Sequence, residues 1–444
     1  MNTSLRHRIA LTACCIALAW APGAHAQLDW TQHPANPVLV PGPSGAWDRG
    51  GVVASSVIQD GDTLRMWYSG VPSLSNPASF AIGYAWSTDG VSWTKHLGNP
   101  VMTDRPGEWD APGVAIPIVI KDGDTYRMWY GAGGCPDDMS LGYATSTDGL
   151  TWERLPAPVM ERGPAGEWNV DYLSPGSVIK EGDLFKMWFF SGTGSVCNNN
   201  TPGTHGSTGY ATSPDGITWT LYDDPATTDP PYQFSDPVLK PGPSDAWDSI
   251  LAISSHVLPT ATGYELWYSG RRSSEQDIGY ATSPDGITWA KHEGNPVFEA
   301  PAWAPGGLVY PSVLHDGDTY RMWVQGWQNN SASIGYATAP LAVSSEPGAT
   351  PSDMGALHPA YPNPITAGTT LSYTLEQPAY VTLAVYDLLG RQVARLVDAA
   401  RPAGASTLAW DGRGTHGHYL STGVYVVRLH VNGETQSRKV LLLR

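Results

Sequence analysis

Short runs of apolar residues, separated by Gly and Asp turns, recur along residues 27–345, and three fragments return with them. The first is Arg-Met-Trp-Tyr-Ser-Gly at 65–70, and its central tryptophans are Trp67, Trp129, Trp188, Trp267 and Trp323. The second is Gly-Tyr-Ala at 83, 142, 209, 279 and 335, and the third is Ser-x-Asp-Gly-x-Ser/Thr-Trp at 87, 146, 213 and 283. A period of roughly 56–79 residues is typical of proteins built from repeated supersecondary units.

Within each period the pattern predicts four β-strands. In the first period, Val52–Ile58 is apolar throughout, Leu64–Ser69 and Ala81–Ser87 alternate, and Ser92–His96 follows an Asp-Gly turn. Four-stranded antiparallel sheets at this period are propeller blades, so we expect an all-β, five-bladed β-propeller. The last period lacks its fourth strand, but the N-terminal Trp-Thr-Gln-His at 30–33 matches Trp-Thr-Lys-His at 93–96. The N-terminal strand should therefore complete the last blade and remove its exposed edge.

The two ends of the chain have other patterns. Residues 1–26 combine Arg6 and Arg8 with an apolar run and a final Ala-His-Ala, which is the layout of a secretory signal peptide. Residues 346–358 read as a linker, and 359–444 hold six strand-like runs, which predicts a small immunoglobulin-like β-sandwich. No other apolar run is long enough to span a membrane, so we expect an exported monomer without a transmembrane segment.

Charge and cysteine content narrow the partners and the compartment. At a net charge of −16 the chain would repel phosphate backbones and anionic lipid, which argues against nucleic-acid binding. Cys135 and Cys197 fall in equivalent loops of the second and third repeats. In an oxidising compartment we expect them to form a disulfide, with two inert thiols as the alternative.

The two sides of the predicted ring differ. One side carries the short and nearly identical Asp-Gly turns, and we call it the turn face. The other side carries loops that are long and differ between repeats, at 71–80, 133–139, 193–207, 271–277 and 327–333. We call this side the loop face and expect the binding site there, because a rigid scaffold with variable loops places function on those loops.

The C-terminal part resembles the type A sorting domain of type IX secretion, which has a flagellar-hook-cap-like immunoglobulin fold. The matching fragments are Tyr-Pro-Asn-Pro at 361–364, Val-Tyr-Asp at 385–387, Trp-Asp-Gly at 410–412 and Ser421–Tyr425. The resemblance implies that residues 359–444 engage the type IX secretion machinery. It also implies that the protein is secreted or held at the outer-membrane surface of a Gram-negative, Bacteroidota-like bacterium. An ordinary accessory sandwich is the alternative.

The repeats resemble the five-bladed propellers of glycoside hydrolase families 43 and 32, through the Met-Trp-Tyr-Ser-Gly and Gly-Tyr-Ala-x-Ser-x-Asp-Gly fragments. This resemblance implies a carbohydrate substrate and catalytic carboxyl groups on the innermost strands of separate blades. Here the matching positions hold Ala54, Ile116, Pro175, Ser254 and Tyr310, none of which is acidic. Glycoside hydrolysis needs two carboxyl groups, so this departure puts the activity in question.

The nearest carboxylates lie just before the first strands. Asp48 and Asp110 follow a repeated tryptophan and Asp171 breaks the repeat, so these three are the candidate catalytic residues. The alternative for the Trp-Asp pairs is architectural, with Asp capping the start of the strand. The candidate substrate-binding residues carry rings or charges that suit sugar, and they are Arg49, Tyr172, Asp248, Arg271, Trp327 and Tyr310.

No zinc-ligand spacing and no phosphate-binding loop occurs in the sequence, so we expect neither a catalytic metal nor a cofactor. His256 stands where other repeats have Ser56, Ile118, Ser177 and Ser312. It is either a core histidine or the ligand of a central ion, and a structural cation such as calcium is the ion that a propeller channel would hold.

Together these features predict a secreted carbohydrate-active protein, and first a glycoside hydrolase acting on extracellular oligo- or polysaccharide. The alternative is a non-catalytic glycan-binding or surface-adhesion propeller that has lost its acids, and a third interpretation is a propeller that binds proteins. Two carboxyl groups converging at the channel mouth would favour the enzyme. A mouth lined by Ser, Tyr and Trp would favour the binder.

Overall fold

The structure is a computed structural model, and it describes residues 28–73, 80–133, 139–194, 205–260, 262–273, 276–328, 331–341 and, with short gaps, 356–443. The chain divides into two compact units, Met1–Ser344 and Ser345–Arg444. The predicted signal peptide, Cys135 and Cys197 lie outside the described residues. No helix among the described residues is long and apolar enough to cross a membrane.

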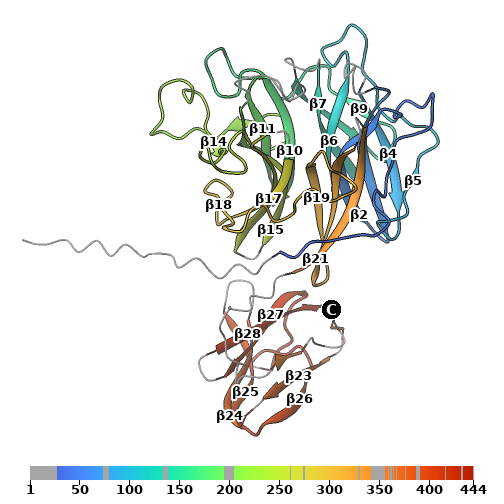
Figure 1. The fold of residues 1–444 in the computed structure, drawn as a ribbon. Coiled ribbons are helices and arrows are strands. Elements are labelled where there is room, and N and C mark those ends of the chain that lie inside the picture. The colour runs from blue at the N-terminus through green and yellow to red at the C-terminus, as the bar shows by residue number, and fades with distance from the viewer. Residues whose placement is uncertain are drawn as a thin grey trace, which may run out of the picture. The chain divides into compact units, whose positions relative to one another are not determined.

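The first unit is a five-bladed β-propeller, as predicted (Figure 1). Each blade is an antiparallel sheet, and the first strands of the five blades contact one another in turn, with the last contacting the first, so they surround the axis. Blades one and two consist of β2 (Gly51–Asp60), β3 (Thr63–Val71), β4 (Ala81–Ser87), β5 (Thr94–Lys95), and β6 (Val114–Asp122), β7 (Thr125–Ala132), β8 (Ser140–Ser146), β9 (Glu153–Arg154). Blade three consists of β10 (Tyr172–Glu181), β11 (Leu184–Thr193), β12 (His205–Ser213), β13 (Thr220–Leu221), with β14 (Pro237–Leu239) paired to β12. Blades four and five consist of β15 (Leu251–Thr260), β16 (Gly263–Arg271), β17 (Gln276–Ser283), β18 (Ala290–Lys291), and β19 (Leu308–Asp316), β20 (Thr319–Gln328), β21 (Ser331–Pro340).

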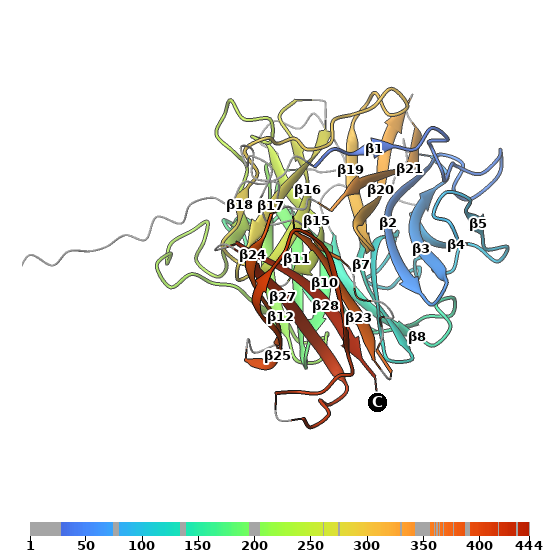
Figure 2. The ribbon, with the colours of Figure 1, turned by 90° about the horizontal axis from the view of Figure 1, so that it is seen from below.

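The N-terminal strand closes the ring, which confirms the prediction. β1 (Thr31–Gln32) pairs antiparallel with β21, with Thr31 opposite Thr338 (Figure 2). Trp30 stacks on Phe298 of blade four and contacts Tyr320 of blade five, with ring centroids 6.1 and 6.2 Å apart. Closure therefore joins both ends of the propeller sequence in one blade.

The repeated fragments are explained by packing inside and between blades. The glycine of Gly-Tyr-Ala leaves room for two rings: a Cβ on Gly83 would lie 2.7 Å from Trp47 and 2.8 Å from Tyr68. In the Ser-x-Asp-Gly turn, the Asp89 carboxylate accepts the backbone N–H groups of Val91 and Ser92. The turn glycine adopts a positive φ, 81° at Gly90, which side chains rarely tolerate.

The blades are joined by a repeated hydrogen bond. The central tryptophan of one blade donates its indole N–H to the turn glycine carbonyl of the next, as in Trp129 to Gly216 at 2.8 Å. The same bond runs from Trp67 to Gly149, from Trp188 to Gly286 and from Trp323 to Gly90. The Trp267 Nε1 has no partner among the described residues, because blade five lacks the Ser-x-Asp-Gly turn that follows the third strand in the other blades.

The second unit is a small immunoglobulin-like β-sandwich, as predicted. Its two sheets have the order β22 (Ala356–Leu357), β23 (Thr369–Leu375), β26 (Gly404–Trp410), and β25 (Gln392–Arg401), β24 (Ala379–Tyr386), β27 (Gly423–Val431), β28 (Glu434–Leu442). Side chains from both sheets form one buried core, which includes Tyr373, Trp410, Val385 and Val427.

Candidate functional site

All five first strands bulge where they approach the axis. Three residues at these bulges have positive φ although they are not glycine: 40° at Ala54, 53° at Ile116 and 51° at Tyr310. Such angles cost about 1–3 kcal/mol each, so the surrounding structure must hold them in place.

The preceding blade holds these strained residues. The Ile116 N–H donates to Ser69 Oγ at 2.8 Å, the Tyr310 N–H to Ser269 Oγ at 3.0 Å, and the Ala54 N–H to Gln325 Oε1 at 3.0 Å. Ser69, Ser269 and Gln325 are buried on the second strand of their blades. The bulges are thus a built feature of the channel, fixed from blade to blade.

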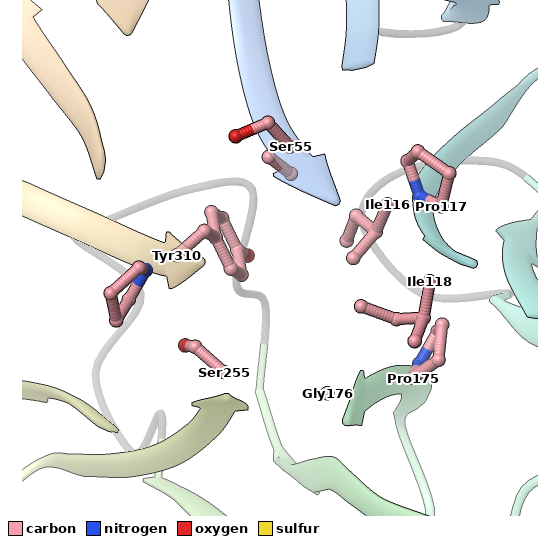
Figure 3. A pocket seen from close by; sticks show the side chains of 10 residues that line it. Ser55, Ile116, Pro117, Ile118, Pro175, Gly176, Ser255 and Tyr310 are labelled. Atoms are coloured by element: carbon pink, nitrogen blue, oxygen red, sulfur yellow. The ribbon is translucent and has the colours of Figure 1, made fainter. Parts of the chain in front are cut away.

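The bulges surround a small cavity on the axis (Figure 3). Its space for a water-sized sphere is about 10 Å³, which is room for one water molecule and not for a sugar ring. Its lining carries hydroxyl groups and apolar groups but no carboxylate: Ala54, Ser55, Ile116, Pro117, Ile118, Pro175, Gly176, Ser255, Tyr310 and Pro311. The register against the central tryptophans confirms that the positions aligned from the sequence are equivalent.

On the loop-face side of the bulges an apolar cluster crosses the channel. Tyr172 and Phe190 of blade three are fully buried in it with Leu251 and Ile253 of blade four, and Tyr310 of blade five packs at its edge. The Phe190 ring lies 5.8 Å from that of Tyr310 and 6.4 Å from that of Tyr172. The cluster places apolar side chains over the channel, where a hydrolase would need opposed carboxyl groups.

Two of the Trp-Asp carboxylates are held in identical ion pairs within their blades. Asp48 is buried and accepts from Lys95 Nζ at 2.5 Å and from the Tyr68 hydroxyl at 3.4 Å. Asp248 accepts from Lys291 Nζ and the Tyr268 hydroxyl in the same way. Burial raises the pKa of the Tyr68 hydroxyl and Asp48 raises it further, so this phenol stays a donor to the carboxylate.

Asp110 occupies the equivalent place in blade two with arginine partners. Its side chain is completely buried. Its two oxygens share the single N–H of Arg105 Nε, at 2.9 and 3.0 Å, and one of them also accepts from Arg154 at 3.0 Å. Each of the three Trp-Asp carboxylates therefore neutralises cations of its own blade. These side-chain contacts hold the carboxylates inside their blades, whereas the capping of the strand start that the architectural alternative described is not among the contacts of the described residues.

Four of the remaining candidates, Asp171, Tyr172, Arg271 and Tyr310, come from blades three, four and five, and two of them, Tyr172 and Arg271, are buried. Asp171 precedes β10 and accepts the N–H of Gly194 at 2.7 Å, and the next residue, Tyr172, donates to the His205 carbonyl at 3.3 Å. The pKa of Tyr172 is raised, first by burial and then by Tyr310, while Arg271 lowers it and Asp171 raises it. The buried Tyr172 hydroxyl therefore keeps its proton and stays a donor to the His205 carbonyl.

The other candidates lie apart. Arg49 is exposed on the loop that precedes β2, and Trp327 is half-buried at the end of β20, where its backbone N–H donates to the Gly307 carbonyl. His256 is half-buried on β15. Desolvation of its imidazole lowers its pKa to about 4, with His315 as a smaller cause.

The described residues offer no evident metal site. Within them, no group of three or more His, Cys, Asp or Glu side chains is placed to hold an ion. Calcium takes about six to eight oxygen ligands, often carboxylates. The lining of the axial cavity, with three hydroxyl groups and no carboxylate, does not fit it.

Phe190 and Ser55 are site residues that the sequence reasoning missed. Phe190 lies opposite Ser174 and Thr208 on the two neighbouring strands. It therefore occupies in blade three the position that Ser69 occupies in blade one. The signal was the fragment Trp-Phe-Phe-Ser-Gly, in which blade three carries one residue more than Trp-Tyr-Ser-Gly. Ser55 gave no such signal, because Ser is common at this part of the strand.

The two units are similar to different known proteins. Residues 363–434 match the family model described as the FlgD Ig-like domain. An uncharacterised protein of Mycobacterium tuberculosis is 32% identical over 193 residues, which cover 42% of this chain and 60% of that protein. The 1,2-β-oligomannan phosphorylase of a Thermoanaerobacter species is 31% identical over 125 residues, or 27% of this chain and 41% of the phosphorylase. The chain thus spans about 60% of the length of the first of these relatives and less of the second.

Solved structures share the propeller fold. A glycoside hydrolase of unproven activity from Bacteroides ovatus has a TM-score of 0.56 at 18% identity, covering 71% of this chain and 97% of its own. A structure from the GH130 family of mannoside phosphorylases, which contains glycoside hydrolases that target β-1,2-mannosidic linkages in Candida mannan, has a TM-score of 0.54 at 16% identity. It covers 74% of this chain and 98% of its own. The propeller is therefore of the kind found in family 130, a refinement of the resemblance to families 43 and 32.

Proposed function

We propose that the propeller is a carbohydrate-active protein that recognises an extracellular glycan of the β-mannoside class at its loop face. The ligand class is supported by two similar proteins, one an oligomannan phosphorylase and the other from a family that acts on β-1,2-mannosidic linkages. The position is supported by Arg49, Asp171 and Trp327, which are exposed or half-buried at the loop-face ends of their strands and offer a charge, an acceptor and a ring to a sugar.

One observation favours recognition without cleavage: no bulge position on the axis carries a carboxyl group, and Asp48, Asp110 and Asp248 are neutralised by their own blades. A glycosidase needs two carboxyl groups on opposite sides of one glycosidic bond, about 5–10 Å apart. Carboxylates locked in buried ion pairs cannot move there without leaving charged partners behind. The geometry thus favours the binding alternative over the hydrolase.

The test is calorimetric titration of the mature chain with β-1,2-mannotriose, with β-1,4-mannotriose and cellotriose as comparisons. We expect binding of the first, weakened at least fivefold by Asp171→Asn and by Arg49→Ala on the loop face. Asp62→Asn, the same substitution at an exposed carboxylate on the turn face, is the control and should leave affinity unchanged. Absence of binding to any mannoside would refute the proposal.

A glycosidase or β-mannoside phosphorylase is the second candidate, and the sequence identity with the oligomannan phosphorylase favours it. Asp171 would be its carboxylate, since it lies next to Tyr172 and within electrostatic reach of the same phenol as Arg271. Incubation of β-1,2-mannotriose with and without phosphate, followed by chromatography, separates the outcomes. Mannose 1-phosphate indicates phosphorolysis, free mannose indicates hydrolysis, and unchanged substrate with measurable binding supports the first candidate.

We further propose that residues 359–444 are the export and sorting unit of the chain, at the outer-membrane surface or beyond it. The Ig-like fold and the match to the FlgD Ig-like domain support an accessory module of this class. Deletion of these residues in a bacterium with type IX secretion should leave the propeller in the periplasm, as detected by cell fractionation. Normal export of the deleted chain would refute this role.

A further inference from the structure

Blade three carries an insertion that blades one, two and four lack. The segment from the tryptophan of the Asp-Gly turn to the next conserved-pattern proline runs from Trp219 to Pro237, but only from Trp93 to Pro100 in blade one. We call residues 223–235 the rim insertion, which leads into β14 at the outer side of the blade (Figure 1). The fold does not require it, because the other blades make the same connection without it.

Hydrogen bonds hold the rim insertion in one conformation. Asp236, which is buried at its end, accepts the Asp224 N–H at 2.9 Å and the Thr227 hydroxyl at 2.8 Å. Blade one has asparagine at this position, and the Asn99 side chain bonds the backbone of Tyr84 in its own blade instead. The carboxylate of blade three therefore serves the insertion, which is a folded element.

The rim insertion is docked on the segment that leads to Asp171 at the start of β10. The Trp168 backbone N–H donates to the Pro231 carbonyl at 3.0 Å, and the Trp168 indole donates to the Ser235 carbonyl at 2.9 Å. Three residues of chain reach about 10 Å at most, so Trp168 ties the insertion to the neighbourhood of Asp171. The insertion thus borders the loop face beside one of the candidate glycan contacts.

A buried carboxylate completes the docking. The Gln233 backbone N–H donates to Glu167 Oε2 at 3.1 Å. Glu167 is buried, whereas Glu108, which precedes the equivalent tryptophan of blade two, is exposed. The difference follows from the insertion, which covers this position only in blade three.

Phe234 is presented to solvent between two of these anchors. It is 56% exposed, although Ser235 beside it is buried and the Gln233 backbone is bonded to Glu167. Tyr232 behaves differently, since it packs against the core of blade three with Lys240 Nζ 4.2 Å from its ring centre. Anchors on both sides keep the Phe234 ring outward, so its exposure is a built feature of the insertion.

We infer that Phe234 forms an outer subsite, which stacks on a sugar ring of a glycan that extends beyond the loop-face site. This inference rests on the proposed function. An aromatic ring offers a large, rigid apolar face to the C–H face of a pyranose, and the exposed Gln233 amide can donate to and accept from its hydroxyls. Because the insertion is rigid before binding, little conformational entropy is lost.

The surroundings of the ring favour a sugar over a protein surface. The exposed neighbours on the insertion are polar, namely Asp223, Asp229 and Gln233, so the ring is not part of a wide apolar patch of the kind that marks protein interfaces. At a net charge of −16, a second copy of the chain would also be repelled.

The test is calorimetric titration of the mature chain with β-1,2-linked mannotriose and mannohexaose. We expect the hexaose to bind about five- to tenfold more tightly than the triose, because only the longer chain reaches the ring. Phe234→Ala should remove this gain and leave the triose affinity unchanged, and Phe234→Trp should keep the gain. Ile217→Ala, at a 37% exposed apolar residue on the turn face of the same blade, is the control and should change neither affinity.

The outcomes separate this subsite from the proposed function. If the triose binds but the hexaose gains nothing, or if the gain survives Phe234→Ala, the subsite is refuted and the proposed function stands. If neither oligosaccharide binds, both are refuted. Light scattering tests a different occupant: a dimer of the mature chain that Phe234→Ala abolishes would assign the ring to a contact between copies and overturn the subsite.

Discussion

Asp110 shows what a single buried carboxylate does in this propeller. It is the acceptor for Arg105 and Arg154, and removing its charge leaves two guanidinium groups facing a neutral amide. We expect Asp110→Asn to cost about 2–3 kcal/mol, somewhat less than for a fully buried pair because the arginines are partly exposed. Thermal denaturation measures the loss.

Glu108 provides the control on the same loop. It is exposed and has no ion pair among the described residues, so Glu108→Gln should leave Tm unchanged. If Asp110→Asn instead kept its stability while abolishing turnover of a mannoside, the catalytic interpretation of Asp110 would be restored.

His256 should make the propeller sensitive to acid. Its pKa in the folded chain is lowered to about 4, below the ordinary value of 6.5, so the unfolded chain binds the proton more readily. This histidine therefore leaves the free energy of unfolding unchanged above pH 6.5. As pH falls from 6.5 towards 4, it lowers that free energy by about 2–3 kcal/mol. Three other blades have serine at the position of His256, and each of these serines accepts a backbone N–H of the next blade: Ser56, Ser177 and Ser312. His256→Ser therefore places in blade four a residue that the fold already accepts there.

The measurement is Tm against pH from 7.5 to 4.5 for both chains. We expect the two curves to separate below pH 6.5, with the wild-type chain falling faster. Parallel curves would show that water in the channel already solvates the protonated imidazole.

At the scale of the element, the blades are held together by the bond from a central tryptophan to the next turn. Trp129→Phe removes the bond to the Gly216 carbonyl, whereas Trp267→Phe removes none, since Trp267 Nε1 has no partner among the described residues. Both indoles are completely buried, so the loss of packing is similar. We expect Trp129→Phe to cost about 1 kcal/mol more in urea denaturation than Trp267→Phe. Equal costs would mean that packing alone joins the blades.

The repeat made most elements predictable and left the site largely hidden. Ala81–Ser87 is observed with its predicted bounds, and the predicted strand Ser92–His96 is reduced to Thr94–Lys95, where pairing is limited to two residues of β4. Strand periodicity depends on neighbouring residues, which a sequence displays directly. The partners of the carboxylates cannot be read from neighbouring residues. Asp48 contacts Lys95, which is 47 positions away in the sequence, and only the folded blade brings the two together.

The same reasoning explains the partial success at the axis. Aligning the repeats identified Ala54, Ile116 and Tyr310 as the axial positions, because register follows the central tryptophans. The alignment gave no view of their backbone, whose positive φ depends on side chains of the preceding blade such as Ser69 and Ser269. Nor did it reveal that the ring of Phe190 in blade three reaches that of Tyr310 in blade five.

At the scale of the whole molecule, the two units have separate hydrophobic cores. The sandwich core is made of residues from 357 to 442, and the propeller clusters contain residues only up to 341. We expect residues 27–345, produced alone, to melt within about 2 °C of the propeller transition in the mature chain, because independent domains fold on their own. Calorimetry of both proteins tests this expectation. A shift of more than about 5 °C would show that the sandwich stabilises the propeller.

A much smaller deletion at the other end should do far more damage. Residues 27–33 contribute β1, the buried Leu28 and the Trp30 indole that packs on Phe298 and Tyr320. Without them blade five exposes the edge of β21, and the cluster around Trp267 and Val313 loses its cover. Loss of one partly buried tryptophan and one buried leucine costs about 3–5 kcal/mol, so residues 34–345 should melt about 5–10 °C below residues 27–345. If the shortened propeller melted at the same temperature, the closing strand would be dispensable, and the ring would be held by its four complete blades alone.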